Sequence, residues 1–373
     1  MGREKVEVRQ GVAWLRGGLW GGGWAFVVAV ALGACASVGG GADGAGETVE
    51  ASCGGGGEVG VVRRSRPLMG TVWTIHAVVE GSEGEAEAAV EAALDEASRL
   101  EGLISEWRPD SDVGRVNAGA GGGAVAVSAE TMELLRQSRV WSERTAGAFD
   151  VTWRPLGEVW RIEGSGRVAL PESSVLEAAR GRVGWRRLEL DEGRSTARLP
   201  EAGMAVGVGA MGKGWAASRA AEALRARGLG RFVINAGGDV VASGCAPGGG
   251  PWKVAVTDPA REGYLGVVLA RDVAVMTSGG YEKFIEIDGV RYSHIIDPRS
   301  GRPARGVPSV TIIAADGGAA DALATAVFVL GVEAGLALVE ELAGVEAILV
   351  AEDGKVRYSS GAEAMFEAVE GER

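Results

Sequence analysis

An aspartate and a threonine lie four residues apart near the end of this 373-residue chain. Asp321 and Thr325 fall within the run 319–330, whose apolar residues recur at helical spacing. Residues at i and i+4 share one face of a helix, so the two side-chain oxygens point the same way. A carboxylate and a hydroxyl are hard ligands of the kind that Mg²⁺ accepts. The same spacing also occurs as a helix cap followed by a surface residue, so the pair alone leaves both interpretations open.

A glycine-rich segment before a predicted helix carries a second group of candidates. The run Gly207–Gly212 fits G-x-G-x-x-G, and with Lys213 it nearly fits a phosphate-binding P-loop. Neither motif is complete, because Asn235 stands where a dinucleotide fold expects an acid and Gly214 where a P-loop expects a hydroxyl. What remains is glycine-rich backbone and a lysine at a helix amino end. That combination suits a phosphate, or it serves tight packing of the helix on a strand.

The chain has two histidines, and they have different surroundings. His76 lies in the middle of a predicted strand, where a structural or solvent-facing role is expected. His294 lies at the end of another, before Ile295 and Ile296. Near a pyrophosphate, an imidazole can act as an acid–base group or donate a hydrogen bond. The alternative for His294 is a structural residue that bonds to backbone in the turn.

The elements that must position these residues are helices and strands, with hairpins in the second half of the chain. Helical spacing predicts a long helix over Glu83–Ile104, and Ser128 is placed to cap a second helix. Asp288 and Gly289 predict a tight hairpin. This mixture predicts an α+β fold of mixed, largely antiparallel sheets packed with helices. Further strands are predicted at 71–79, 149–153, 204–208, 231–235, 252–257, 265–270, 273–277, 281–287, 290–296 and 307–314, with a hairpin at 187–199 and helices at 213–227, 319–330 and 332–342.

The composition excludes several classes of protein. Hydrophobic residues make up 46% and charged residues 24%, which is globular. With 38 Lys and Arg against 50 Asp and Glu, the net charge of −12 makes nucleic acid an improbable partner. Three cysteines and two histidines exclude a disulfide scaffold and a zinc finger.

The amino terminus has the pattern of a targeting segment followed by a tether. Basic residues precede an uncharged apolar run at 19–34, the length of a signal-peptide h-region. The residues Leu32–Cys35 resemble a bacterial lipobox, in which the cysteine becomes lipidated. Ten of the 22 residues at 39–60 are glycine, which is typical of a flexible tether. We expect a lipoprotein signal peptide at 1–34, a tether at 35–60 and one catalytic body at 61–373.

These expectations place the protein outside the cytoplasm, on the periplasmic face of a bacterial membrane and held there by a lipid anchor. A plain secretory signal with an incidental cysteine is the alternative. If Cys35 is lipidated, Cys53 and Cys245 remain, and a disulfide between them stays open.

Eight segments of the body occur in an order that resembles one known family, the ApbE-type FAD:protein FMN transferases, once described as thiamine-biosynthesis lipoproteins. The resemblance spans roughly residues 66–350. The segments are Arg66–Thr71, Ser105–Asp112 with Arg115–Asn117, Gly147–Thr152, Gly212–Gly214, Asn235–Asp239, Thr277–Gly279, Ser293–Pro298 with Gly301, and Asp321–Thr325.

The resemblance implies an enzyme that binds FAD with Mg²⁺, cleaves the pyrophosphate and joins FMN to a Thr or Ser hydroxyl of an acceptor protein, releasing AMP. A membrane or extracytoplasmic redox protein is the expected acceptor. Some relatives chiefly hydrolyse FAD to FMN and AMP. The alternatives are therefore an FAD pyrophosphatase and a non-catalytic flavin-binding lipoprotein.

The resemblance also implies roles for individual residues. Trp107 is expected to stack on an FAD ring, and Ile295 to contact FAD through its backbone. The carbonyl of Ala210 joins the oxygens of Asp321 and Thr325 around the metal, and either His294 or Asp321 is the general base. The remaining positions expected to line the FAD site are Met69, Ala148, Phe149, Asp150, Gly207 and Lys213.

One position departs from the family pattern. The family usually has Asp where this chain has Gly207, six residues before Lys213. The carboxylate contact made there must be absent or replaced in this chain. If the turn has re-formed around Gly207, its backbone is expected to use a positive φ, which favours glycine.

Overall fold

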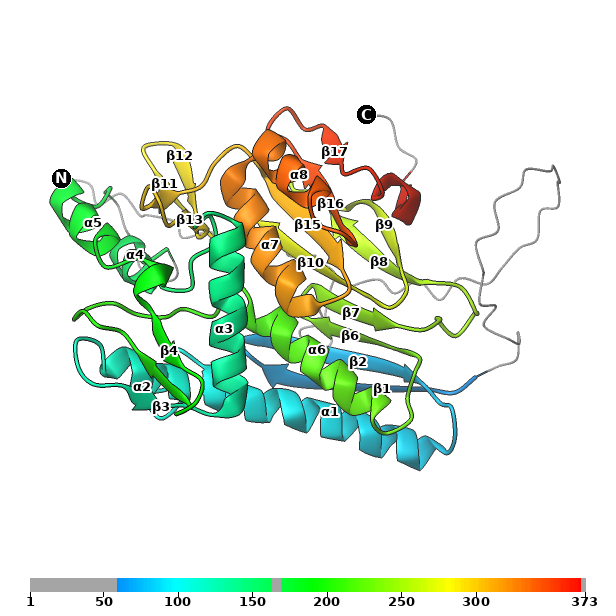
Figure 1. Ribbon diagram of the computed structural model, residues 1–373. Coiled ribbons are helices and arrows are strands. Elements are labelled where there is room, and N and C mark those ends of the chain that lie inside the picture. Colours follow the sequence, from blue (N-terminus) through cyan, green and yellow to red (C-terminus); the bar gives the residue numbers. More distant parts are fainter. Residues whose placement is uncertain (1–58, 163–168, 370–373) are drawn as a thin grey trace, which may run out of the picture.

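An eight-stranded antiparallel sheet forms the centre of the computed structural model, which describes residues 59–162 and 169–369 (Figure 1). The strand order is β1-β2-β6-β7-β10-β15-β16-β17, and every neighbouring pair is antiparallel. The bounds are β1 Val61–Leu68, β2 Thr71–Val78, β6 Phe232–Ala236, β7 Asp239–Ser243, β10 Val273–Gly279, β15 Ser309–Ala314, β16 Val345–Val350 and β17 Val356–Tyr358.

The helices and four small sheets surround this sheet. The helices are α1 Glu83–Ile104, α2 Asp112–Ala118, α3 Ala129–Arg144, α4 Arg154–Trp160, α5 Ser173–Arg180, α6 Gly212–Arg225, α7 Gly317–Leu330 and α8 Val332–Glu340, with 3-10 turns at Trp185–Arg187 and Glu363–Met365. The small sheets comprise β3 Val125–Ala126, β5 Thr196–Arg198 and β4 Glu189–Asp191; β18 Phe366–Ala368, β9 Tyr264–Ala270 and β8 Trp252–Thr257; β11 Phe284–Ile287 and β12 Val290–Ser293; and β13 Ile296–Asp297 and β14 Arg302–Pro303.

Three layers result from the way the two faces of the large sheet are buried. Helices α1, α6 and α7 cover one face, where their apolar stripes and the inward side chains of the strands form the main core (Figure 1). The sheet β18-β9-β8 covers the other face, with Trp252 and Val254 packed against Val233 and Val240. The predicted α+β class with largely antiparallel sheets is confirmed.

The strongest sequence signals fixed element bounds correctly. The predicted helix Glu83–Ile104 has the bounds of α1, because Ser82 and Glu85 form a capping box at its start. Ser128 caps α3 by accepting from the N–H of Thr131. The Asp288-Gly289 hairpin joins β11 to β12, and both residues have positive φ as a type I′ turn requires.

Two predicted strands are absent from the described structure. Residues 149–152 form turns, because the Asp150 carboxylate accepts from the N–H and hydroxyl of Thr152 and so competes with strand pairing. Residues 204–208 make one bridge, between Ala205 and Trp153. There the side chain of Asn117 takes the place of a neighbouring strand by bonding both the N–H and the C=O of Val206.

Cys245, 1% exposed, forms a disulfide. It is the one cysteine among residues 59–162 and 169–369. The expected signal peptide, the lipobox cysteine and most of the tether lie outside the described residues. Among the described helices, none has the length and apolar character needed to cross a membrane.

Candidate functional site

The amino end of α6 packs directly against α7, and two glycines make that approach possible. A Cβ at Gly214 would lie 2.1 Å from the carbonyl oxygen of Gly317, and a Cβ at Gly317 would lie 2.4 Å from that of Gly214. The N–H of Gly214 donates to Asp321 Oδ2 at 3.0 Å. The glycine-rich segment thus packs one helix against another, and it brings the first turn of α6 onto the predicted metal ligand.

Lys213 lies between two carboxylates at this junction. Its Nζ is 3.1 Å from Asp239 Oδ2, at the start of β7, and 3.9 Å from Asp321 Oδ2 on α7. Burial by itself lowers the pKa of Lys213, but the two carboxylates outweigh it and raise that pKa above its ordinary value. The lysine is therefore a fixed cation at a helix amino terminus, an arrangement that suits a phosphate.

The site holds more negative than positive charge. Asp239 and Asp321 are buried, and Glu282 lies close enough to Asp239 and Lys213 to interact with both charges. Burial raises the pKa of Asp321, a shift that Lys213 opposes and Asp239 reinforces. Desolvation and the like charge of Asp239 raise the pKa of Glu282 to about 7. Three carboxylates around one ammonium favour the arrival of a further cation.

The three predicted metal ligands fit a magnesium ion in the chemistry of their donors. Asp321 and Thr325 lie one turn apart on α7, as predicted, and Thr325 Oγ1 is 3.5 Å from Ser278 Oγ on β10. Ala210 lies in the turn before α6. Within the described part of the chain, no group of three or more His, Cys, Asp or Glu side chains is arranged to hold a metal. One carboxylate with neutral oxygens is the pattern of a Mg²⁺ site completed by substrate phosphates.

Sequence reasoning did not select Asp239 and Glu282 as site residues. Asp239 Oδ1 also accepts from the N–H of Thr277, so the carboxylate joins β7, β10 and α6. The sequence did carry a signal for Asp239, because it ends the segment Asn235–Asp239, one of the eight that carry the family resemblance. Glu282 lies just beyond β10, and only the fold shows that this strand end meets α6.

His294 and Ile295 follow β12 on the same side of the sheet as the end of β10. A Cβ at Gly280, just past β10, would lie 3.6 Å from the Cβ of Ser293. His294 Nδ1 lies 3.1 Å from the carbonyl oxygen of Lys283, which assigns the proton to Nδ1. Ile295 has its N–H bonded to Ser293 Oγ and its C=O to the N–H of Ala304. Its carbonyl keeps a second lone pair for the predicted backbone contact.

Ala148, Phe149 and Asp150 are buried, so their side chains lie inside the protein and are not exposed to solvent. Asp150 Oδ2 accepts from the N–H of Trp185, and burial raises the pKa of Asp150 despite these hydrogen bonds. A Cβ at Gly147 would lie 3.9 Å from Cγ of Arg299, which places this segment beside the loop that follows Ile295.

Met69 occupies the tight turn between β1 and β2, where its φ is 51°. A Cβ at Gly237 would lie 2.1 Å from Oγ1 of Thr71, so this turn lies against the turn that leads to Asp239. The structure thus brings Met69 to the end of the sheet where β7 begins with Asp239 and β10 ends. Lys213 of α6 lies at the same place.

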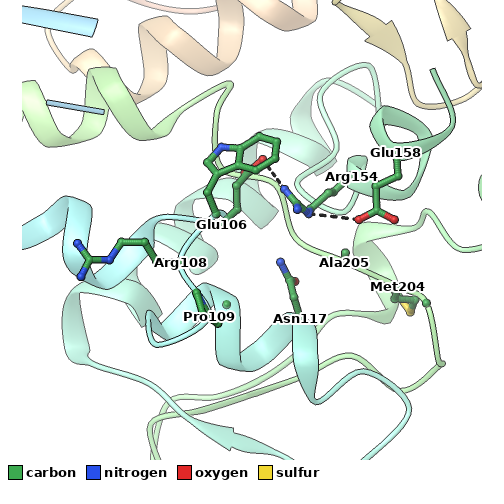
Figure 2. Close-up of a pocket in the computed structure, with 11 residues that line it drawn as sticks. Glu106, Arg108, Pro109, Asn117, Arg154, Glu158, Met204 and Ala205 are labelled. Atoms are coloured by element: carbon green, nitrogen blue, oxygen red, sulfur yellow. Dashed lines mark hydrogen bonds and ion pairs between the residues drawn. The ribbon is translucent and has the colours of Figure 1, made fainter. Parts of the chain in front are cut away.

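Trp107 projects from the loop after α1, and its side chain is 76% exposed. Beside it lies a pocket of about 320 Å³, lined by Glu106, Arg108, Pro109, Asn117, Arg154, Glu158, Met204 and Ala205 among others (Figure 2). Arg154 lies over the Trp107 ring at 4.6 Å from its centroid. An exposed indole next to a pocket is a platform for an aromatic ring.

Gly207 is buried beside this pocket, and the reason for a glycine is space. Its φ is not positive, so the left-handed backbone expected for a re-formed turn is not found. A Cβ there would lie 2.7 Å from Trp153 Nε1, which donates to the carbonyl oxygen of Gly207 at 3.1 Å. The indole occupies the space that an aspartate side chain would need.

A lysine at a helix amino terminus, on an α+β scaffold, suits a ligand that carries phosphate groups. The sequence profile of the ApbE family matches residues 69–349, and the chain belongs to that family, as predicted. It is 36% identical to the FAD:protein FMN transferase of Treponema pallidum, covering 83% of this chain and 90% of that protein. The Vibrio cholerae protein of the same name is 31% identical over 80% of this chain and 90% of that protein.

Solved structures agree with the sequence relatives. The ApbE protein of Thermotoga maritima superposes with a TM-score of 0.76 at 30% identity, covering 83% of this chain and all of that one. The flavin transferase ApbE of Vibrio cholerae gives 0.73 at 29% identity, covering 82% and 99%. The sequence-based prediction of an enzyme of this family is confirmed.

Proposed function

We propose that this protein transfers FMN from FAD to a Thr or Ser hydroxyl of an acceptor protein and releases AMP. The observation that carries the proposal is the meeting of Lys213, Asp321 and the amino end of α6 at one sheet edge. The relatives named FAD:protein FMN transferase support the substrate and the reaction.

The phosphates of FAD would lie at the amino end of α6, where Lys213 offsets the charge that develops on the pyrophosphate. Asp321, Thr325 and the carbonyl of Ala210 would hold Mg²⁺, and the phosphate oxygens would complete its coordination. When bound, the ion supplies Lewis acidity to the phosphoryl group. Asp239 keeps the ammonium of Lys213 in place during the reaction.

His294 is the better of the two predicted general bases. Its Nδ1 lies 3.1 Å from the carbonyl oxygen of Lys283, so Nε2 is the basic nitrogen of the neutral ring, and an imidazole can take the proton of a hydroxyl. Asp321 already accepts from the N–H of Gly214, and in this proposal it would be a metal ligand. The oxygen of the acceptor then attacks the phosphorus on the FMN side of the pyrophosphate, and AMP leaves with the bridging oxygen.

The flavin and adenine ends of FAD would contact the remaining predicted residues. Trp107 offers the exposed ring platform, and Ile295 the second lone pair of its carbonyl. The buried segment Ala148–Asp150 and the Met69 turn would limit the space around the nucleotide.

Incubating the protein with FAD, Mg²⁺ and a candidate acceptor carrying the target Thr or Ser tests this function. AMP release together with a flavin-labelled acceptor is the expected result. AMP with free FMN only, with each acceptor tried, would identify an FAD pyrophosphatase instead. FAD binding without AMP would identify a flavin carrier.

We further propose that the enzyme works outside the cytoplasm as a lipoprotein anchored to the membrane through Cys35. Its acceptor would be an extracytoplasmic redox protein. The disulfide of Cys245 supports an oxidising compartment. Cys35→Ala should release the protein from membranes or leave its signal unprocessed, as fractionation and mass spectrometry would show. Mature wild-type protein recovered in the soluble fraction with an unmodified Cys35 would contradict the anchor.

A further inference from the structure

The carboxylate of Glu106 binds the glycine-rich turn from outside it. Its Oε2 accepts from the N–H of Val208 at 2.6 Å, and its Oε1 accepts from Arg154 Nη1 at 3.0 Å. Its side chain is only 6% exposed. Both oxygens are therefore engaged within the protein, and a buried carboxylate with charged and backbone donors is held firmly in place.

Arg154 extends this contact to the neighbouring indole. The guanidinium that binds Glu106 also lies over the ring of Trp107, 4.6 Å from its centroid. A second carboxylate, Glu158, approaches Arg154 Nε at 3.6 Å but is 64% exposed (Figure 2). One cation thus joins the exposed platform at Trp107 to the carboxylate that binds the turn.

The turn cannot carry a carboxylate of its own at Gly207. The indole of Trp153 fills the space beside that residue, as described above. It is itself wedged against a second glycine, because a Cβ at Gly157 would lie 2.6 Å from its Cζ3. Glu106 brings a carboxylate to the same turn from the loop after α1.

We propose that Glu106 is a positioning residue, which replaces the carboxylate missing at Gly207 and, through Arg154, fixes the turn and the Trp107 platform relative to each other. The proposal rests on the proposed function, because the turn carries the Ala210 carbonyl and leads into Lys213. Glu106 acts through the turn and Arg154, because each of its oxygens accepts a hydrogen bond from one of them. Its loss should therefore weaken FAD binding more than it slows the chemical step.

The first test compares Glu106→Gln with Glu367→Gln. The amide of Gln offers one oxygen instead of two and no charge, so either Val208 or Arg154 loses its acceptor. We expect FAD to bind about 10- to 100-fold more weakly, the range of one charged hydrogen bond, while kcat at saturating FAD changes less than about 3-fold. Glu367→Gln removes an exposed carboxylate that pairs with Lys253 on the sheet β18-β9-β8, away from the pocket, and should leave both quantities unchanged.

FAD affinity is measured by flavin fluorescence, apart from turnover, so that the outcomes separate. If the wild-type protein fails to bind FAD, the proposed function is wrong. If it binds FAD and Glu106→Gln binds it equally well, or if Glu367→Gln loses as much affinity, the positioning role is wrong and the function stands. If Glu106→Gln does not fold, as judged by circular dichroism, Arg154→Lys is the substitute test. Lysine keeps the positive charge but lacks the planar guanidinium that lies over Trp107. Unchanged FAD affinity in Arg154→Lys would overturn the proposal.

Moving the carboxylate back into the turn gives a second test. The double variant Glu106→Gln/Trp153→Val removes the Glu106 carboxylate and opens the space that the indole fills beside Gly207. Adding Gly207→Asp to it then places a carboxylate next to the N–H groups of the turn. We expect the triple variant to recover at least about 3-fold in FAD affinity over this double variant. No recovery in a folded triple variant would show that a carboxylate at the turn is not what FAD binding requires.

Discussion

Lys213 and Asp239 form an ion pair that joins the first turn of α6 to the edge of the central sheet, with Nζ and Oδ2 3.1 Å apart. Asp239 also accepts from the N–H of Thr277, so the carboxylate has little freedom to move. The ammonium is consequently positioned before any ligand binds. Groups fixed in this way stabilise developing charge without the cost of reorganising during the reaction.

Replacing Lys213 with Met should remove this fixed charge while keeping most of the side-chain volume. We expect AMP release to slow by about 10²- to 10³-fold, the usual loss for one preorganised group that stabilises transition-state charge. Lys253→Met is the matched control, because Lys253 forms an exposed pair with Glu367 on a different sheet. The measurement is the initial rate of AMP formation at saturating FAD and Mg²⁺, and a loss below about 3-fold would remove Lys213 from the phosphate site.

Asp321→Asn should lower turnover by at least about 10²-fold, because it removes the one carboxylate of the proposed Mg²⁺ site. FAD affinity should fall less, since the proposed contacts of FAD with Trp107 and the backbone remain. Asp316→Asn makes the same change at the amino end of the same helix, where Asn still caps, and should leave turnover intact. Titrating Mg²⁺ against AMP release checks the site, and an unchanged Mg²⁺ dependence in Asp321→Asn would place the metal elsewhere.

The sequence predicted those parts of the fold that local rules determine. The bounds of α1 follow from its capping box and helical periodicity, and the β11–β12 hairpin follows from Asp288-Gly289. The predicted strand at 149–153 failed because an aspartate bonded to Thr152 produces a turn, which hydrophobic pattern alone does not reveal. Helices α4 and α5 were missed, since α4 has seven residues and α5 eight, too few for a clear periodic signal.

The candidate site shows the same division. Lys213, Asp321 and Thr325 were predicted, and the structure brings Lys213 within 3.9 Å of Asp321. Glu106 and Arg154 were not predicted as a contact, because they are 48 residues apart in the sequence and only folding brings them together. The reason for glycine at 207 also needed the structure, since Trp153 is far from it in sequence.

Asp112 should make the stability of the protein depend on pH. Burial raises the pKa of Asp112, but hydrogen bonds from Ser128, Thr131 and Arg115 outweigh it, so that pKa lies below its ordinary value. A lowered pKa in the folded state contributes stability above the unfolded pKa of about 3.9, and this stability is lost as pH falls through the folded value.

Asp112→Asn should therefore cost about 2 kcal/mol of unfolding free energy at pH 7, the range of hydrogen bonds to a charged group. The difference from wild type should shrink as the pH falls below about 4. Asp110→Asn, in the exposed loop before it, is the control. Urea unfolding at several pH values measures the effect, and a difference between wild type and Asp112→Asn that does not vary with pH would show that the charge is unimportant.

Gly207→Asp should destabilise the protein, although it restores the residue type that the family pattern has there. The new Cβ would lie 2.7 Å from Trp153 Nε1 and 3.0 Å from its Cε2, closer than Cβ atoms approach ring atoms. The indole cannot simply move away, because it is bonded to the Gly207 carbonyl and packed against Gly157. Overpacking of this kind costs about 1–3 kcal/mol.

We therefore expect Gly207→Asp to melt at a lower temperature than wild type and to bind FAD more weakly, because the displaced indole disturbs the turn that Glu106 holds. Gly209→Asp is the control for melting temperature, since a Cβ at Gly209 has nothing within 4 Å and the residue lies in the same turn. Thermal unfolding of both variants and FAD titration of Gly207→Asp are the measurements. Tighter FAD binding with an unchanged melting temperature would mean that Trp153 yields easily and that Gly207 marks a lost contact rather than a filled space.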